Sequence, residues 1–253
     1  MKSRFLAAIG FLTKIPVPER FQMDQDSLAE SSRYFPIVGL VASLGLAGFD
    51  YLATRFFPLR VACVLDIFFL FVITGGMHLD GLIDTADGLL GGRTREDALT
   101  IMRDSRIGAM GAITVVLLIL SKYALLVSLP VNDRVPALIL APVLGRWAML
   151  LGVACFPYAR QERGMGTVFV CSRNGQESVS PLKRLCVPAV LTILPVVGVA
   201  RSRGVCALII CSFVSLACSR KISGYLGGLT GDVYGFLSEI CEALALVVFC
   251  VNA

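Results

Sequence analysis

The apolar residues of this chain are concentrated in seven runs, which are separated by polar segments. A helix needs roughly 20 predominantly apolar residues to cross the hydrocarbon core of a bilayer, and somewhat fewer where the bilayer is thin. The first four runs reach this length and the last three are shorter. The runs predict an all-α, polytopic membrane protein with about seven transmembrane helices in one integral membrane domain, residues 1–253. They are 36–57, 60–78, 107–129, 135–157, 185–200, 204–219 and 240–251.

Composition supports the bilayer as the solvent of this chain. Hydrophobic residues make up 56% of the sequence and charged residues 16%, whereas a soluble domain has about 25% charged residues. The net charge of +5 does not indicate a nucleic-acid partner, because the basic residues are spread over several loops. A membrane protein with basic cytoplasmic loops gives the same net charge. The expected surroundings are therefore the lipid bilayer.

The distribution of Lys and Arg predicts the orientation. With a cytoplasmic N-terminus, four segments face inward and hold 5, 4, 5 and 2 Lys or Arg, whereas the outer loops hold five. Basic residues favour the cytoplasmic side, so we expect a multi-pass protein of the cell inner membrane whose active site faces the cytoplasm. The first of these segments is expected to carry an interfacial helix. The inward segments are 1–35, 79–106, 158–184 and 220–239.

The nine cysteines do not predict disulfides or a zinc site. Eight of them lie in or beside apolar runs, where cysteine usually serves as a small apolar residue. Cys171 is the exception and lies in a polar loop, and the sequence has no CxxC pair. Charged residues also lie within or near the apolar runs. Four of them are expected either to have a function, as charges within a membrane usually do, or only to pair or to reach the membrane surface. They are Asp50, Asp66, Lys122 and Arg146.

Three aspartates follow the second apolar run, in the stretch GGMHLDGLIDTADGLLGG. Asp80, Asp84 and Asp87 are spaced i, i+4 and i+7 and therefore share one face if the stretch is helical. Carboxylates on one face repel each other, and a bound cation removes that cost. Oxygen ligands without cysteine suit a hard ion, Mg²⁺ ahead of Mn²⁺ or Ca²⁺, and the flanking glycines allow a phosphate to approach the backbone closely. The alternative is a solvated acidic helix end.

Other polar residues extend this candidate site. Arg103 and Arg106 suit phosphate oxygens, with a surface ion-pair network as the alternative. Asp104 lies between them and is expected either to complete the metal site or to fix an arginine. Asp232 is expected to help close the site, or else to cap a helix. His78 is assigned to substrate binding, although a packed or second-shell histidine fits the sequence equally well. Together, carboxylates, arginines and glycines at a membrane surface indicate phosphoryl transfer.

These motifs resemble the cobalamin synthase family, the adenosylcobinamide-GDP ribazoletransferases. The resemblance rests on an ordered set that covers essentially the whole chain: FLTKIPVP, RYFPIVGL, GGMHLDGLIDTADGL, IMRDSRIGAMG, GRW, YAR and GGLTGDVYG. Such a resemblance implies that adenosylcobinamide-GDP and α-ribazole, or its 5′-phosphate, give adenosylcobalamin, or its phosphate, and GMP. In this reaction a ribose hydroxyl attacks the phosphorus nearer the cobinamide, and GMP leaves.

The residues would divide the work of such a reaction as follows. Asp80, Asp84 and Asp87 are expected to hold Mg²⁺ and the pyrophosphate, and one of them or Asp104 deprotonates the incoming hydroxyl. Two alternatives of other classes are a CDP-alcohol phosphotransferase and a cation transporter. The chain lacks the Ala-Arg pair that follows Asp-Gly in the sequence pattern of the CDP-alcohol phosphotransferases. It also has no visible internal repeat of the kind found in many transporters. The sequence leaves the oligomeric state open.

Overall fold

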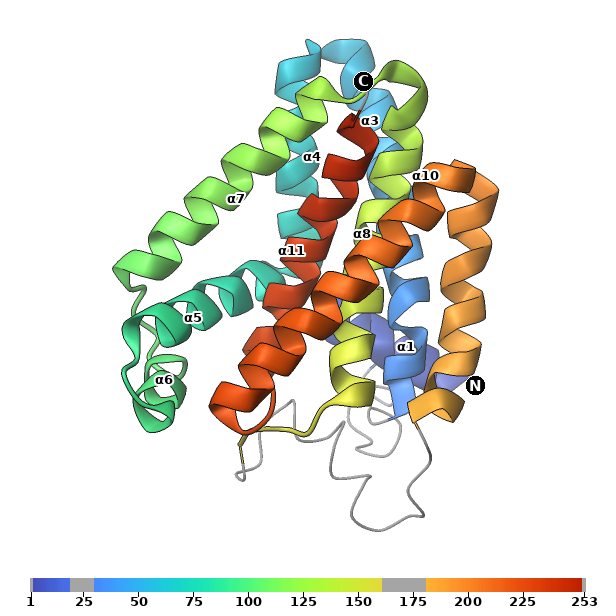
Figure 1. The fold of residues 1–253 in the computed structure, drawn as a ribbon. Coiled ribbons are helices and arrows are strands. Elements are labelled where there is room, and N and C mark those ends of the chain that lie inside the picture. The colour runs from blue at the N-terminus through green and yellow to red at the C-terminus, as the bar shows by residue number, and fades with distance from the viewer. Residues whose placement is uncertain (1, 19–29, 161–180, 252–253) are drawn as a thin grey trace.

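The computed structural model describes residues 2–18, 30–160 and 181–251, and it forms a bundle of helices (Figure 1). The chain therefore has the expected all-α class. The helices are α1 (Lys2–Leu12), η2 (Ser32–Tyr34), α3 (Phe35–Phe56), α4 (Leu59–Thr74), α5 (Met77–Gly91), α6 (Arg95–Ile101), α7 (Ala109–Ser128), α8 (Val131–Cys155), α10 (Pro181–Leu226) and α11 (Gly231–Cys250).

Five helices in the described part of the chain are long and apolar enough to cross a membrane, or six spans if the bent pair α4–α5 is counted as one. This confirms a multi-pass membrane protein, although the bounds of some helices differ from those of the apolar runs. The two runs 185–200 and 204–219 form two helical arms, as expected, and α10 joins them across a kink. The chain reverses at Arg201, whose φ is +42° and ψ −119°, and both ends of α10 lie at the lower end of the bundle in Figure 1.

The second apolar run does not extend to residue 78 as expected. Helix α4 ends at Thr74, and Gly75 and Gly76 both take left-handed backbone angles, with φ of +64° and +71°. Glycine adopts this conformation at no steric cost. Helix α5 then starts at an angle of 91° to α4, so it runs sideways from the lower end of α4 (Figure 1). The aspartates therefore lie on a separate helix, beyond the end of α4.

The last span begins earlier than the sequence indicated. Helix α11 starts at Gly231, with the hydroxyl of Thr230 accepting a hydrogen bond from the backbone N–H of Val233 at 3.4 Å. The expected span 240–251 is too short, because residues 231–239, which were expected in an inward-facing segment, form the first half of the helix. Glu239 and Glu242 are buried within it. Glu239 lies immediately before the expected run, and its charge hid the earlier start of the helix.

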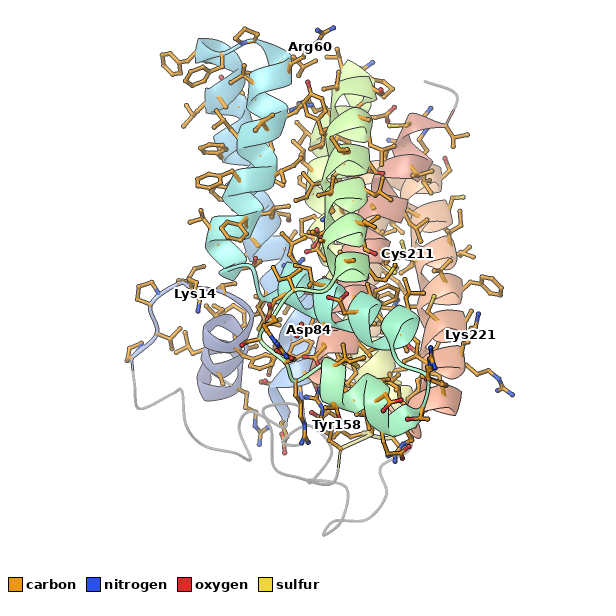
Figure 2. The ribbon with its side chains drawn as sticks, turned by 90° about the vertical axis from the view of Figure 1, so that its left-hand side faces the viewer. Lys14, Arg60, Asp84, Tyr158, Cys211 and Lys221 are labelled. Atoms are coloured by element: carbon orange, nitrogen blue, oxygen red, sulfur yellow. The ribbon has the colours of Figure 1, made fainter. Side chains whose placement is uncertain are left out.

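Helix α8 forms the centre of the bundle. Its residues from Ala137 to Ala154 are buried without interruption, and α3, α10 and α11 pack around it. The outer helices instead expose large apolar side chains, as a bilayer requires. Figure 2 shows the molecule from the side, with Arg60 at one end and Tyr158 and Lys221 towards the other. Examples of the exposed side chains are Phe56, Phe68, Leu117, Leu120, Ile209 and Phe213.

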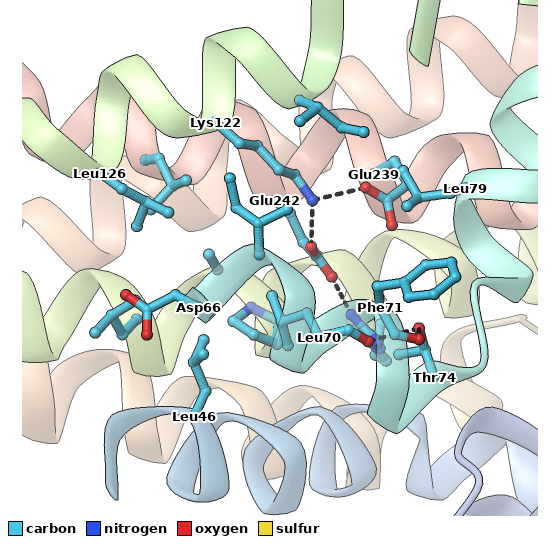
Figure 3. A pocket seen from close by; sticks show the side chains of 17 residues that line it. Leu46, Asp66, Leu70, Phe71, Thr74, Leu79, Lys122, Leu126, Glu239 and Glu242 are labelled. Atoms are coloured by element: carbon cyan, nitrogen blue, oxygen red, sulfur yellow. Dashed lines mark hydrogen bonds and ion pairs between the residues drawn. The ribbon is translucent and has the colours of Figure 1, made fainter. Parts of the chain in front are cut away.

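The four charged residues singled out in the apolar runs are all paired inside the bundle. Lys122 donates to Glu239 at 2.6 Å and to Glu242 at 2.7 Å, and Arg146 pairs with the second oxygen of Glu242. This group borders a cavity of about 640 Å³ between α3, α4, α7, α8 and α11 (Figure 3). A separate group closer to the other end joins Arg134 to Asp50 and Asp66, at 2.5 and 2.9 Å.

The eight cysteines in the described part of the chain are all free, as expected, and Cys171 lies outside it. Helix α1 is too short to cross a bilayer. It packs against α3, with Ala8 and Leu12 buried and the ring of Phe11 stacked on Phe35 at 6.1 Å between centroids. It therefore covers the same end of the bundle as α5 and α6.

Candidate functional site

The centre of the site is a close crossing of α5 and α11. A Cβ on Gly81 would lie 2.6 Å from the carbonyl oxygen of Asp232, and one on Gly235 would lie 3.0 Å from the carbonyl oxygen of His78. Two helices approach this closely only where both lack side chains at the contact. Gly81 was expected to face a phosphate, but it serves helix packing. The crossing brings Asp80 and Asp84 of α5 beside Asp232 at the start of α11.

The segment after α8 is fixed to the segment before α11. The N–H of Ala159 donates to the carbonyl of Leu229 at 2.8 Å, and the N–H of Leu229 donates to the carbonyl of Pro157 at 2.8 Å. This short parallel contact places Arg160 next to the first turn of α11. Its guanidinium pairs with the carboxylate of Asp232 at 2.9 Å. A cation is thereby added to the acidic group.

Helix α6 is attached to the same two segments. Arg95 donates to the carbonyl oxygens of Leu226 at 2.7 Å and Ala159 at 3.2 Å. The start of α6 is fixed by a capping box, in which Thr94 and Asp97 each bond the other's backbone N–H. Arg160 also reaches the carbonyl of Met102 at 3.4 Å. The loop that carries Arg103 therefore lies against the segment after α8.

Asp84 lies in a crowded negative environment. Burial, and after it the charges of Asp80 and Asp232, raise the pKa of its carboxyl to about 7, although Arg160 opposes them. Figure 2 shows Asp84 and Tyr158 in the half of the molecule opposite Arg60. A carboxyl whose pKa rises by this much next to other carboxylates is a common feature of functional sites.

Asp87 has a different environment from the other two aspartates. One oxygen of its carboxylate accepts from the N–H of Gly108 at 2.8 Å and the other accepts from the N–H of Gly111 at 2.8 Å. Asp87 is 7% exposed, and a Cβ on either glycine would collide with its carboxylate. Asp87 therefore caps the N-terminus of α7, where backbone N–H groups otherwise lack partners.

Asp104 and Arg106 form an ion pair on the surface. The carboxylate of Asp104 accepts from the backbone N–H of Arg106 at 3.0 Å and from its guanidinium at 2.6 Å. The bonds from Arg106 lower the pKa of Asp104 to about 2. The side chain of Arg106 is 88% exposed. The pair borders an open hollow beside Asp87, not the cavity next to Asp232.

A cavity opens where α5, α11, α3 and the segment after α8 meet. Its empty volume is about 830 Å³, including the open mouth, and Asp80, Asp232 and Arg160 line one part of it. His78 also lines it. This residue is only 1% exposed, and neither of its ring nitrogens has a hydrogen-bond partner among the described residues. The cavity is thus lined by three residues that were predicted for the site, Asp80, Asp232 and His78, and by Arg160, which was not.

Two residues that pair with predicted charged residues were not assigned a role from the sequence. The only signal for Arg160 was its place in the motif YAR; residues 161–166, which follow it, lie outside the described part of the chain. Glu242 sits in an apolar run and partners both Lys122 and Arg146. Unpaired cations predicted within spans were the signal that acidic partners had to exist.

The donor set suits a hard cation. No group of three or more His, Cys, Asp or Glu side chains within the described residues is close enough together to hold a metal by itself. Mg²⁺ normally takes only one or two protein carboxylates and completes its shell with water and substrate phosphates. Asp80 and Asp84 offer carboxylate oxygens. Burial and, after it, the neighbouring carboxylates raise the pKa of Asp84, and a cation would offset the charge of those carboxylates. These residues therefore fit Mg²⁺ bound together with a phosphate substrate.

Comparison with known proteins covers nearly the whole chain. A family model described as Cobalamin-5-phosphate synthase matches residues 4–250. The chain is 34% identical over 246 residues to the adenosylcobinamide-GDP ribazoletransferase of Acetivibrio thermocellus, a match that covers 97% of this chain and 96% of that protein. Against the protein of the same name from Roseiflexus sp. (strain RS-1) the identity is 40%, with coverage of 97% and 88%. No solved structure matches the chain.

Proposed function

Since this chain belongs to the cobalamin-5-phosphate synthase family, we propose that it is an adenosylcobinamide-GDP ribazoletransferase. It joins adenosylcobinamide-GDP to α-ribazole, or to α-ribazole 5′-phosphate, and releases GMP. The single observation that carries this proposal, beyond the family match, is the meeting of Asp80, Asp84, Asp232 and Arg160 at one end of the bundle. The family match leaves the CDP-alcohol phosphotransferase and the cation transporter without support.

The proposed reaction exchanges one phosphorus–oxygen bond for another. A ribose hydroxyl forms a bond to the phosphorus nearer the cobinamide, and the bond from that phosphorus to the oxygen bridging to GMP breaks. The hydroxyl proton passes to a carboxylate that faces the cavity, Asp80 or Asp232. Asp104 is less suited to this task, because its pair with Arg106 lowers its pKa to about 2.

The remaining residues bind and orient the pyrophosphate. Arg160 is held by Asp232, so its guanidinium is fixed before substrate arrives, and we assign it to a phosphate oxygen. Arg103 and Arg106 are proposed to contact the donor from the loop between α6 and α7. Mg²⁺, held by Asp80 and Asp84, would neutralise charge on the pyrophosphate. Asp87 supports the site by fixing the start of α7.

The orientation is also part of the proposal. We place the end of the bundle that carries the site at the cytoplasmic face of the cell inner membrane, with a cytoplasmic N-terminus. Support comes from the excess of Lys and Arg in the segments at this end. A site at this face can receive water-soluble nucleotide substrates from the cytoplasm while the bundle stays in the bilayer.

Product identification tests the proposed function. Protein purified in detergent is incubated with adenosylcobinamide-GDP, α-ribazole and Mg²⁺, and the products are separated by chromatography. We expect GMP and a corrinoid carrying the ribazole in equal amounts, with neither formed when α-ribazole is omitted. GMP release that does not depend on α-ribazole would make the protein a hydrolase, and the formation of neither product would contradict the proposal.

A further inference from the structure

The cavity beside Asp232 has two chemically different parts. One part carries Asp80, Asp232 and Arg160, and the other is lined by apolar side chains from α1, α3, α5 and α8. Its empty volume is about 830 Å³, including the open mouth. The apolar part is formed by Phe11, Phe35, Met77 and Met149.

The apolar part suits a flat aromatic ring. Phe11 and Phe35 stack with nearly parallel rings, at 6.1 Å between centroids and an angle of 16°. Aromatic ligands pack well against such rings, and the thioethers of Met77 and Met149 add polarisable contacts that adapt to a ring edge. The four side chains of this part are uncharged, so an apolar base that binds there does not strip water from a charged group.

Three polar side chains that line the cavity have buried atoms without a partner in the described part of the chain. These atoms are both ring nitrogens of His78, the hydroxyl of Tyr234 and Nε of Arg160. Buried polar atoms are nearly always hydrogen-bonded in folded proteins. A ligand that brings a few donors and acceptors into an otherwise apolar space would supply the missing partners.

We propose that this cavity is the subsite for the acceptor nucleoside, with its base among Phe11, Phe35, Met77 and Met149 and its ribose directed towards Asp80 and Asp232. This inference rests on the proposed function and adds the location of one substrate. The base of α-ribazole is a methylated benzimidazole, which is flat, largely apolar and has one unprotonated ring nitrogen. Guanine, the base of the leaving nucleotide, carries several polar groups around its edge and suits a Phe and Met wall less well.

Tyr234→Phe tests the subsite, because it removes the unpartnered hydroxyl and leaves the ring. We expect the KM for α-ribazole to rise roughly 5- to 10-fold, since one hydrogen bond is lost. The KM for adenosylcobinamide-GDP and the kcat should change less than twofold. The matched control is Tyr51→Phe, which removes a hydroxyl at the end of α3 that lies away from Phe35 and the cavity. It should leave both KM values and the kcat unchanged. A second variant, Phe35→Leu, removes the aromatic face and should also raise the KM for α-ribazole.

Equilibrium binding separates this inference from the proposed function. α-Ribazole alone is titrated into the detergent-purified protein, and its binding should weaken in both variants and should not be displaced by GMP. If GMP displaces it, or if the variants raise the KM for adenosylcobinamide-GDP only, the cavity binds the guanosine of the donor and the inference is wrong. If the wild-type protein releases no GMP with both substrates, the proposed function itself fails. Normal turnover with an unchanged KM for α-ribazole in both variants would overturn the subsite alone.

Discussion

At the scale of single residues, the three aspartates of α5 divide into two kinds. Asp80 and Asp84 have carboxylates that face other charges, whereas both oxygens of Asp87 are occupied by backbone N–H groups of α7. The i, i+4, i+7 spacing predicted that the three share a helix, but spacing cannot distinguish a ligand from a cap. That distinction depends on Gly108 and Gly111, which lie more than 20 positions further along the chain.

Asp84→Asn keeps the size of the side chain and removes its charge. We expect turnover to fall roughly a hundredfold or more, as when one electrostatic group of an active site is removed. The thermal midpoint in detergent should stay the same or rise, because the change relieves repulsion from Asp80 and Asp232. Higher Mg²⁺ should restore part of the turnover by mass action. Wild-type turnover with an unchanged Mg²⁺ dependence would contradict the metal-binding role and favour the alternative of a solvated acidic helix end.

Asp87→Asn should behave in the opposite way. The amide keeps one acceptor but turns an NH₂ group towards a backbone N–H, so one charge-assisted bond is lost and another is weakened. Such bonds contribute about 1.5–3 kcal/mol to the free energy of unfolding, and the thermal midpoint should fall accordingly. Turnover should fall as well, without rescue by Mg²⁺. A stable Asp87→Asn protein whose Mg²⁺ requirement has risen would instead support a metal-ligand role.

At the scale of helices, the apolar pattern predicted which segments cross the membrane but not where they break. The Gly75–Gly76 doublet ends α4 through two left-handed residues, a backbone choice that hydropathy does not reveal. Helix α11 appeared too short because the charge of Glu239 ended its apolar run, although Lys122 compensates that charge in the folded bundle. Pairing across helices is a property of the folded bundle, so a search along one segment could not find it.

The glycine crossing of α5 and α11 gives a direct test at this scale. Gly81→Ala places a Cβ 2.6 Å from the carbonyl oxygen of Asp232, so the helices must move apart. Overpacking of this kind costs about 1–3 kcal/mol, and the displacement of Asp80 and Asp84 from Asp232 should remove most turnover. The control is Gly91→Ala in the same helix, where the nearest atom to the new Cβ is 3.8 Å away. Comparable losses of activity in both variants would contradict the role given to the crossing.

At the scale of the whole molecule, the described parts of the polar segments expected to face the same side lie at one end of the bundle. Helices α1, α5 and α6, the end of α8 and the start of α11 are all found there (Figure 1). The charge distribution along the sequence was sufficient for this grouping, because it depends only on the order of spans and loops. The charge distribution did not predict which of these residues meet. Arg160 reaches Asp232 because the contact between Ala159 and Leu229 places it there.

Labelling with a membrane-impermeant maleimide tests the orientation in cells. Native cysteines are first replaced. Single cysteines are then introduced at Asn132, near the start of α8, and at Gly91, at the end of α5. We expect Asn132→Cys to react from outside and Gly91→Cys to react only after the membrane is permeabilised. Labelling of Gly91→Cys in intact cells would reverse the assigned orientation.

The most direct test of the central claim measures the release of GMP by Asp80→Asn. The claim is that the carboxylates brought together by α5 and α11 carry out the transfer from adenosylcobinamide-GDP to α-ribazole. Asp80→Asn and the matched control Glu96→Gln, which removes an exposed carboxylate on α6, are purified and compared with the wild type at saturating substrates. The account predicts that Asp80→Asn releases GMP roughly a hundredfold more slowly or worse while Glu96→Gln keeps the wild-type rate. GMP release by Asp80→Asn at the wild-type rate would contradict it.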